Sequence, residues 1–133
     1  MDSIDHIGIA VNSLTEAIPV FAALLGQNPS GNDEVPSEGV RVAFFGDGPG
    51  RLELLEPLTP ESPVARFLTS HGPGVHHVCL ATPDLSVAVA EAQAAGIHVL
   101  EPWIREGAHG TRVAFLHPRS THGVLIELIE RAG

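Results

Sequence analysis

The sequence lacks the residues and runs that several classes of protein require. Cys79 is the single cysteine, which excludes an internal disulfide and a cysteine-rich zinc site. No apolar run reaches the 18 residues or so that indicate a membrane-spanning helix, and the start "MDSIDHIG" has no pattern of a secretion signal. We therefore expect a cytoplasmic protein in a reducing compartment.

Lysine is absent, and arginine supplies all seven side-chain cations against 16 acidic residues, for a net charge of -9. This balance argues against nucleic acid or an anionic membrane as the main partner. An anionic small molecule is still compatible, because a few arginines at a pocket mouth act locally. The length of 133 residues, 44% of them hydrophobic, predicts one domain over residues 1–133.

The chain repeats itself once. The segment "DHIGIAV" at 5–11 matches "HHVCLAT" at 76–82, and "GVRVAFF" at 39–45 matches "GTRVAFL" at 110–116, both at an offset of 71 residues. A third pair, "RLELLEP" and "VLIELIE", aligns Glu53 with Glu127 at an offset of 74. The three extra residues fit a longer turn, since turn lengths vary more freely than strands.

Each half predicts the order strand, helix, strand, strand, strand, which makes an α+β protein of two tandem βαβββ modules. The modules are expected at about 1–58 and 75–133, with a linker carrying a short helix at about 59–74. Capping residues and glycine stops bound the two main helices, in 13–26 and 82–97. Of the second strands, we expect 97–103 to form and its counterpart near 28–35 to be mostly loop.

Strand alternation separates polar from apolar positions. His6 lies on the same face as Gly8, and His77 on the same face as Cys79, so each histidine has a small neighbour on what we expect to be a concave face. Glu53 and Glu127 stand within leucine- and isoleucine-rich strands, where a carboxylate needs a partner.

Taken singly, a strand histidine is most often structural, and a strand glutamate usually reaches solvent. Equivalent positions in a duplicated module favour a shared metal site instead, made of His6, Glu53, His77 and Glu127. Nitrogen and carboxylate donors without a thiolate suit Co, Mn, Ni, Fe(II) or Zn. By alternation His76 points to the opposite face, as a structural residue or as a support for His77, and Cys79 is expected to be a packing residue.

These motifs resemble the vicinal oxygen chelate superfamily, which includes glyoxalases, bleomycin resistance proteins and dioxygenases. Within it, "LELLEPL", "GPGVHHVCL" and "RVAFLHPRSTHGVLIELIE" are similar to the methylmalonyl-CoA epimerases. The resemblance covers almost the whole chain. It implies a curved mixed sheet around a divalent metal, with His6, Glu53, His77 and Glu127 as ligands. Where some epimerases carry a further catalytic glutamate, this chain has Val42.

The resemblance implies an isomerase that interconverts (R)- and (S)-methylmalonyl-CoA by proton abstraction at C2, through a metal-stabilised enolate. Glu53 and Glu127 are then the candidate bases, on opposite faces of the substrate. A homodimer is expected from the resemblance alone. Arg105, Arg112 and Arg119 are the cations nearest the expected pocket rim. The alternatives are a glyoxalase-type isomerase and a non-catalytic small-molecule binding protein of the same fold.

Overall fold

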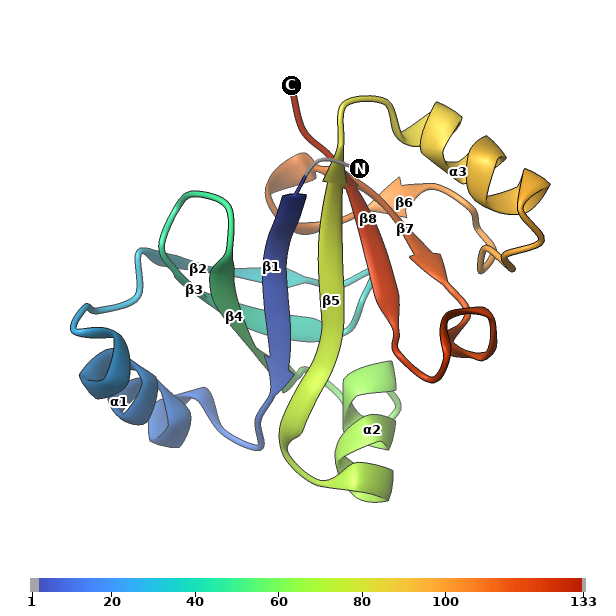
Figure 1. The fold of residues 1–133 in the computed structure, drawn as a ribbon. Helices are drawn as coiled ribbons and strands as arrows, with labels where there is room; N and C mark the ends of the chain where they lie inside the picture. Colours follow the sequence, from blue (N-terminus) through green and yellow to red (C-terminus); the bar gives the residue numbers. More distant parts are fainter. Residues whose placement is uncertain (1–2, 133) are drawn as a thin grey trace.

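The computed structural model describes residues 3–132, which form one curved, mixed sheet of eight strands with three α-helices (Figure 1). The strand order is β2-β3-β4-β1-β5-β8-β7-β6. The strands of the first half are β1 (Ser3–Ala10), β2 (Gly31–Val35), β3 (Val40–Phe45) and β4 (Arg51–Pro57). Those of the second half are β5 (Gly74–Thr82), β6 (Arg105–Glu106), β7 (Arg112–Leu116) and β8 (Ile126–Glu130).

The two halves meet at the centre of the sheet. There β1 and β5 pair antiparallel, while β1 pairs parallel with β4 and β5 pairs parallel with β8. Figure 1 shows these central strands side by side, with one helix of each half on either side of them. The predicted curved sheet is thereby confirmed.

The helices are α1 (Leu14–Leu25), α2 (Pro63–His71) and α3 (Leu85–Ala94). Each begins where a side-chain oxygen accepts a hydrogen bond from a free backbone N–H, and the three capping residues are Ser13, Ser62 and Asp84. Gly26 ends α1 in the left-handed conformation, with φ at 67°, which a glycine adopts without steric cost.

The expectation for the second strands was wrong in both halves. Residues 31–35 form strand β2, paired along its length with β3. In the second half, 97–103 contributes a single bridge between Val99 and Leu116, and β6 follows at Arg105–Glu106. A paired neighbour decides whether a short polar segment becomes a strand, and such pairing is invisible in local composition.

Apolar residues on the two faces of the sheet pack against different helices. Leu54 and Phe45 are buried under α1, Leu128 and Ala114 are buried under α3, and Val42 lies in a cluster with Val64 of α2. Burying one such leucine fully contributes about 1.5–3 kcal/mol. The α2 helix therefore closes one end of the concave face, while α1 and α3 cover the convex face.

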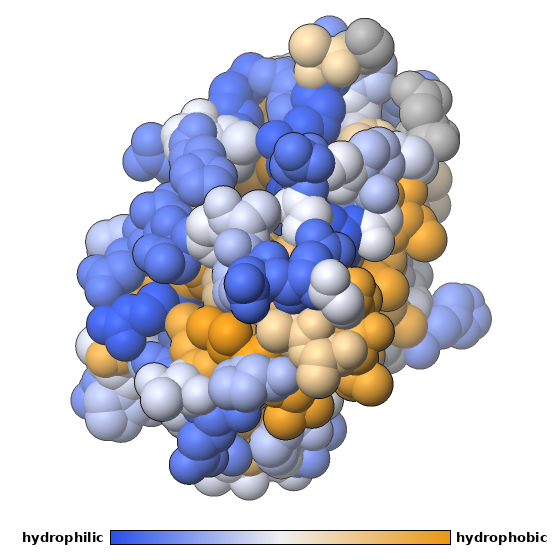
Figure 2. Space-filling model, turned by 90° about the vertical axis from the view of Figure 1, so that its left-hand side faces the viewer, coloured by the Kyte–Doolittle hydropathy of each residue, from blue (hydrophilic) through white to orange (hydrophobic). Residues whose placement is uncertain are grey.

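Apolar surface remains on the side of the molecule that carries α1 (Figure 2). Val20, Leu24 and Leu25 of this helix are exposed. Among residues 3–132, no helix has the length and hydropathy needed to cross a membrane.

Candidate metal centre

Three side chains from both halves converge on the concave face. The Nε2 atoms of His6 and His77 lie 3.1 Å apart. Oε1 of Glu127 lies 3.3 Å from the first nitrogen and 3.0 Å from the second. All three residues are buried, with at most 8% of their surface exposed. Two nitrogen lone pairs cannot face each other at this distance, so a proton or another cation belongs between them.

The sheet register explains the convergence. Gly8, two residues after His6, pairs with Glu53, and Cys79, two residues after His77, pairs with Glu127. Gly8 also makes room for the histidine of the other half, because a Cβ built there would lie 2.2 Å from the His77 ring. The small residue at position 8 is thus a condition for the cluster.

Glu53 occupies the equivalent strand position but stands outside the three-residue group. Its Oε2 lies 3.1 Å from His6 Nδ1, on the side of the ring away from Glu127, and 3.0 Å from Nη2 of Arg51. Burial raises the pKa of Glu53 and outweighs the opposing charges of His6 and Arg51. The structure therefore brings together three of the four predicted ligands and places the fourth against the outer nitrogen of His6.

The residue before each histidine is the extra residue of a β-bulge. Along the β1–β5 pair, Asp5 and His76 are skipped in the register while their neighbours pair. Each bulged side chain reaches the Nδ1 atom of the following histidine, at 2.8 Å for Asp5 and 3.0 Å for His76. The expectation that His76 points to the opposite face is wrong, because the bulge turns it into the cavity beside His77.

Asp5 is held by two arginines as well as by His6. Arg131 donates to both of its oxygens, at 2.9 and 3.2 Å, and Arg51 lies 3.3 Å from Oδ2. Burial raises the pKa of the Asp5 carboxyl. The hydrogen bonds from His6 and Arg131 and the charge of Arg51 lower this pKa by a larger amount, so the carboxyl is ionised.

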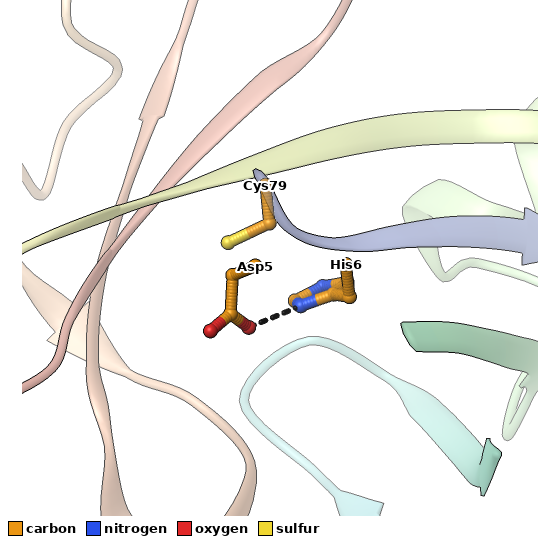
Figure 3. A group of neighbouring side chains, drawn as sticks. All are labelled: Asp5, His6 and Cys79. Atoms are coloured by element: carbon orange, nitrogen blue, oxygen red, sulfur yellow. Dashed lines mark hydrogen bonds and ion pairs between the residues drawn. The ribbon is translucent and has the colours of Figure 1, made fainter. Parts of the chain in front are cut away.

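Asp5, His6 and Cys79 lie close enough to form a second group of potential metal donors (Figure 3). The Cys79 thiol is fully buried, and burial together with neighbouring carboxylates raises its pKa. A neutral thiol is a poor ligand, and Asp5 is already paired with His6, Arg51 and Arg131. Asp5 therefore orients His6 instead of binding a metal in this second group.

Electrostatics favour a cation at the group of His6, His77 and Glu127. Burial lowers the pKa of His6, yet hydrogen bonds to Asp5 and Glu127 and the charge of Glu53 outweigh this and raise it to about 9. Burial raises the pKa of Glu127, but the two histidines lower it to about 2. The surroundings of the two histidines and of Glu127 therefore favour a positive charge where the nitrogens and the carboxylate meet.

The donor set fits a divalent metal ion. Neighbouring ligands on an ion bonded at about 2.1 Å lie roughly 3 to 3.4 Å apart, which is the spacing of His6, His77 and Glu127. Two imidazoles and a carboxylate suit Zn, Co, Mn or Ni and leave positions open for a substrate.

Comparison with known proteins gives the family. The model of the Glyoxalase/Bleomycin resistance protein/Dioxygenase superfamily matches residues 5–115. The chain is 37% identical to human mitochondrial methylmalonyl-CoA epimerase, over 94% of this chain and 72% of the human protein. The chain belongs to the methylmalonyl-CoA epimerase family. It is also 38% identical to the ethylmalonyl-CoA/methylmalonyl-CoA epimerase of Cereibacter sphaeroides, over 94% of this chain and 95% of that one.

A solved structure of an epimerase agrees in fold. A variant of the Streptomyces coelicolor methylmalonyl-CoA epimerase, in complex with 2-nitronate-propionyl-CoA, superposes with a TM-score of 0.92 at 36% identity, covering 98% of each chain. The family, the fold and the enzyme class of isomerase that the sequence predicts are confirmed.

Cavities reach the metal-centre residues of this family member from two sides. One of about 70 Å³ is lined by His76, His77, Glu53 and Glu127 and closed by Val64 of α2. The other, about 40 Å³, lies on the His6 side and shares several residues with a wider cavity of about 680 Å³. The wider cavity is lined by residues that include Phe44, Arg51, His109 and Arg131.

The remaining arginine candidates have different surroundings. Arg105 is mostly buried and lies over the Phe115 ring, whereas Arg112 is half exposed and pairs with Glu130. Arg119 lies in the short 3-10 helix Pro118–Thr121 before β8. Sequence reasoning missed Asp5 and Arg51. The match of "DH" at 5–6 with "HH" at 76–77 was the available signal for Asp5.

Proposed function

We propose that this chain interconverts the C2 epimers of methylmalonyl-CoA, in the cytoplasm, with a divalent ion held by His6, His77 and Glu127. The observation that carries the proposal is this group of three donors, of which His77 and Glu127 line a cavity of about 70 Å³. A water occupies about 30 Å³ in the liquid, so a cavity of this size is too small for a CoA moiety, which would lie outside it.

The reaction requires removal of the C2 proton and its return to the opposite face. A bound divalent ion would stabilise the negative charge that develops on the substrate oxygens, as a Lewis acid. The Streptomyces relative binds 2-nitronate-propionyl-CoA, whose planar anionic nitronate resembles an enolate. This likeness supports an enolate-type reaction for this chain.

Of the two predicted bases, Glu127 is the better placed. It is ionised and lines both small cavities, and its Oε1 faces the nitrogens of His6 and His77. Glu53 also lines both cavities, but one of its oxygens is engaged by His6 and Arg51. We propose Glu127 as one proton-transfer group and Glu53 as a ligand or a second base.

The test combines metal analysis with an epimerisation assay on methylmalonyl-CoA. Protein loaded with Co, Mn, Ni or Zn is expected to epimerise it and to exchange its C2 hydrogen with solvent deuterium. Glu127→Gln is expected to suppress exchange more strongly than Glu53→Gln. Metal-loaded protein that leaves methylmalonyl-CoA unchanged but isomerises methylglyoxal with a thiol would contradict the proposal. A homodimer stays a prediction.

A further inference from the structure

Glu38 lines the cavity of about 70 Å³ outside the group of His6, His77 and Glu127, and Arg105 faces Glu38. Glu38 lies in the turn between β2 and β3 and lines this cavity together with His77 and Glu127. Its Oε1 is 3.9 Å from Nη1 of Arg105, and about a fifth of each side chain is exposed. Among the described residues, this Oε1 and Nε of Arg105 have no hydrogen-bond partner. A buried carboxylate oxygen without a donor is costly, and such atoms concentrate where a protein does chemistry.

The turn holds Glu38 in a defined place. The backbone N–H of Glu38 donates to the Val35 carbonyl at 3.0 Å, and Ser37 Oγ donates to the Glu106 carbonyl at 3.1 Å. Gly39 follows with φ at 67°, and a Cβ there would lie 2.7 Å from Cβ of Ser62. The carboxylate is therefore presented by a constrained turn packed between the other half of the chain and α2.

Arg105 is also fixed. Its Nη2 donates to the carbonyls of Glu101 and Pro102, at 3.2 and 3.3 Å, and its guanidinium lies 5.3 Å from the centre of the Phe115 ring. These contacts hold the guanidinium beside Glu38 without a hydrogen bond to the Glu38 Oε1.

The charges around Glu38 suit a group that both gives and takes a proton. Burial raises the pKa of Glu38 to about 7; Arg105 of β6 and His77 of β5 oppose the rise, and Glu127 of β8 adds to it. Glu38 and Glu127 line the same cavity from different elements, Glu38 beside Arg105 and Glu127 beside His77. Two carboxyl groups with such different surroundings in one cavity are the pattern of an acid and a base that act together.

We propose that Glu38 carries one of the two proton transfers at C2, on the substrate face opposite the glutamate of the metal centre. The inference rests on the proposed function. In one direction the metal-centre glutamate takes the C2 proton, and the electron pair of the broken C–H bond delocalises into the thioester carbonyl. The Glu38 carboxylic acid then gives its proton to C2 from the other face. Each carboxyl ends in the protonation state in which the other began, and the reverse reaction restores them.

The experiment uses the metal-loaded full chain and its Glu38→Gln variant in deuterated water, starting from each epimer separately. Wild-type protein is expected to epimerise both and to exchange both at C2. Glu38→Gln is expected to lose about 100-fold or more in epimerisation, the usual range for removing a general acid–base. Its exchange should persist with the epimer whose C2 hydrogen faces the metal-centre glutamate and be lost with the other. Glu34→Gln, an exposed neighbour on β2, is the matched control.

Three outcomes would overturn the inference. Glu38→Gln could exchange and epimerise like wild type, which leaves the proposed function standing. It could lose exchange equally with both epimers while its metal content is unchanged, which indicates a positioning role only. Wild-type protein could fail to epimerise, in which case the proposed function itself falls.

Glu38→Asp and Arg105→Met provide a second readout. Glu38→Asp keeps a carboxyl and is expected to restore part of the rate. Because Arg105 opposes the rise in the pKa of Glu38, Arg105→Met should move the corresponding limb of the pH–rate profile to higher pH. If this limb of the pH–rate profile stays at the same pH in both variants, it reports another group and the inference is overturned.

Discussion

The two halves of the site use the same backbone with different supporting residues. Each half presents a histidine preceded by a bulged residue that contacts its Nδ1, but this residue is Asp5 in the first half and His76 in the second. Likewise Arg51 stands two residues before Glu53, where the second half has Leu125 before Glu127. The duplicated sheet therefore sets where the donors lie, and the neighbouring side chains set their charge and direction.

The largest effect is expected from a ligand itself. His77→Ala removes a donor contributed by the second half, so bound metal and epimerisation should each fall by more than about 1000-fold, beyond the cost of losing a supporting residue. Metal content after dialysis and the epimerisation rate measure this. His98→Ala, an exposed histidine, should leave both unchanged. A His77→Ala protein that keeps its metal would remove His77 from the site.

Arg51→Leu places in the first half the residue type that the second half has at Leu125. The variant removes the ion pairs of Arg51 with Asp5 and with Glu53, and both of these carboxylates are buried. We expect a loss of about 3 kcal/mol in the free energy of unfolding, measured with urea on metal-free protein. Arg112→Leu removes an exposed pair with Glu130 and should cost less than about 1 kcal/mol. Equal losses would mean that Arg51 does not compensate buried charge.

The pH dependence of the metal-free protein should report the Asp5–His6 half. The pKa of His6 is raised from 6.5 to about 9, so its stabilising contribution is complete below about pH 6.5 and lost as the pH rises through 9. The shift corresponds to about 3 kcal/mol at most, and we expect about 2 kcal/mol of lost unfolding free energy. The pKa of Glu38 is raised from 4.5 to about 7, so the titration of Glu38 changes the unfolding free energy mainly at lower pH.

Unfolding with urea at several pH values between 7 and 9 measures the contribution of His6 to the unfolding free energy. In the His6→Gln variant, the unfolding free energy should depend less on pH between these values. A slope that survives in this variant would point to a different group.

The smallest effect concerns the support of His77. His76→Ala removes the partner of Nδ1 and should weaken metal binding by about 10-fold. His76→Asn retains an acceptor oxygen and should weaken it less. Titration with Zn or Co measures both, and Val75→Ala is an exposed control on the same strand. If His76→Ala binds metal as tightly as wild type, the contact between the two rings has no role in orienting His77.

The sequence predicts the parts of this comparison that follow from repetition and alternation. The equivalence of His6 with His77, the concave face and the helix caps all have local signals. The bulges could not be predicted, because the extra residue of a bulge is defined by the pairing with the neighbouring strand, which the sequence of one strand does not show. The direction of Glu53 depends on Arg51, and the place of Glu38 depends on a turn packed against the other half. Residue type alone carries no signal for either contact.

The ion pair between Asp5 and Arg131 also joins the beginning of β1 to the segment that follows β8. The start of β1 and Arg131 therefore lie close together, and the segment that carries α2 connects the two halves of the sheet. A circularly permuted chain, opened before α2 and with a short peptide linking the segment after β8 to the start of β1, should build the same sheet. In such a chain the two halves would follow each other in the reverse order. Their antiparallel pairing through β1 and β5 would be unchanged, so this contact, and not the order of the halves, would define the fold.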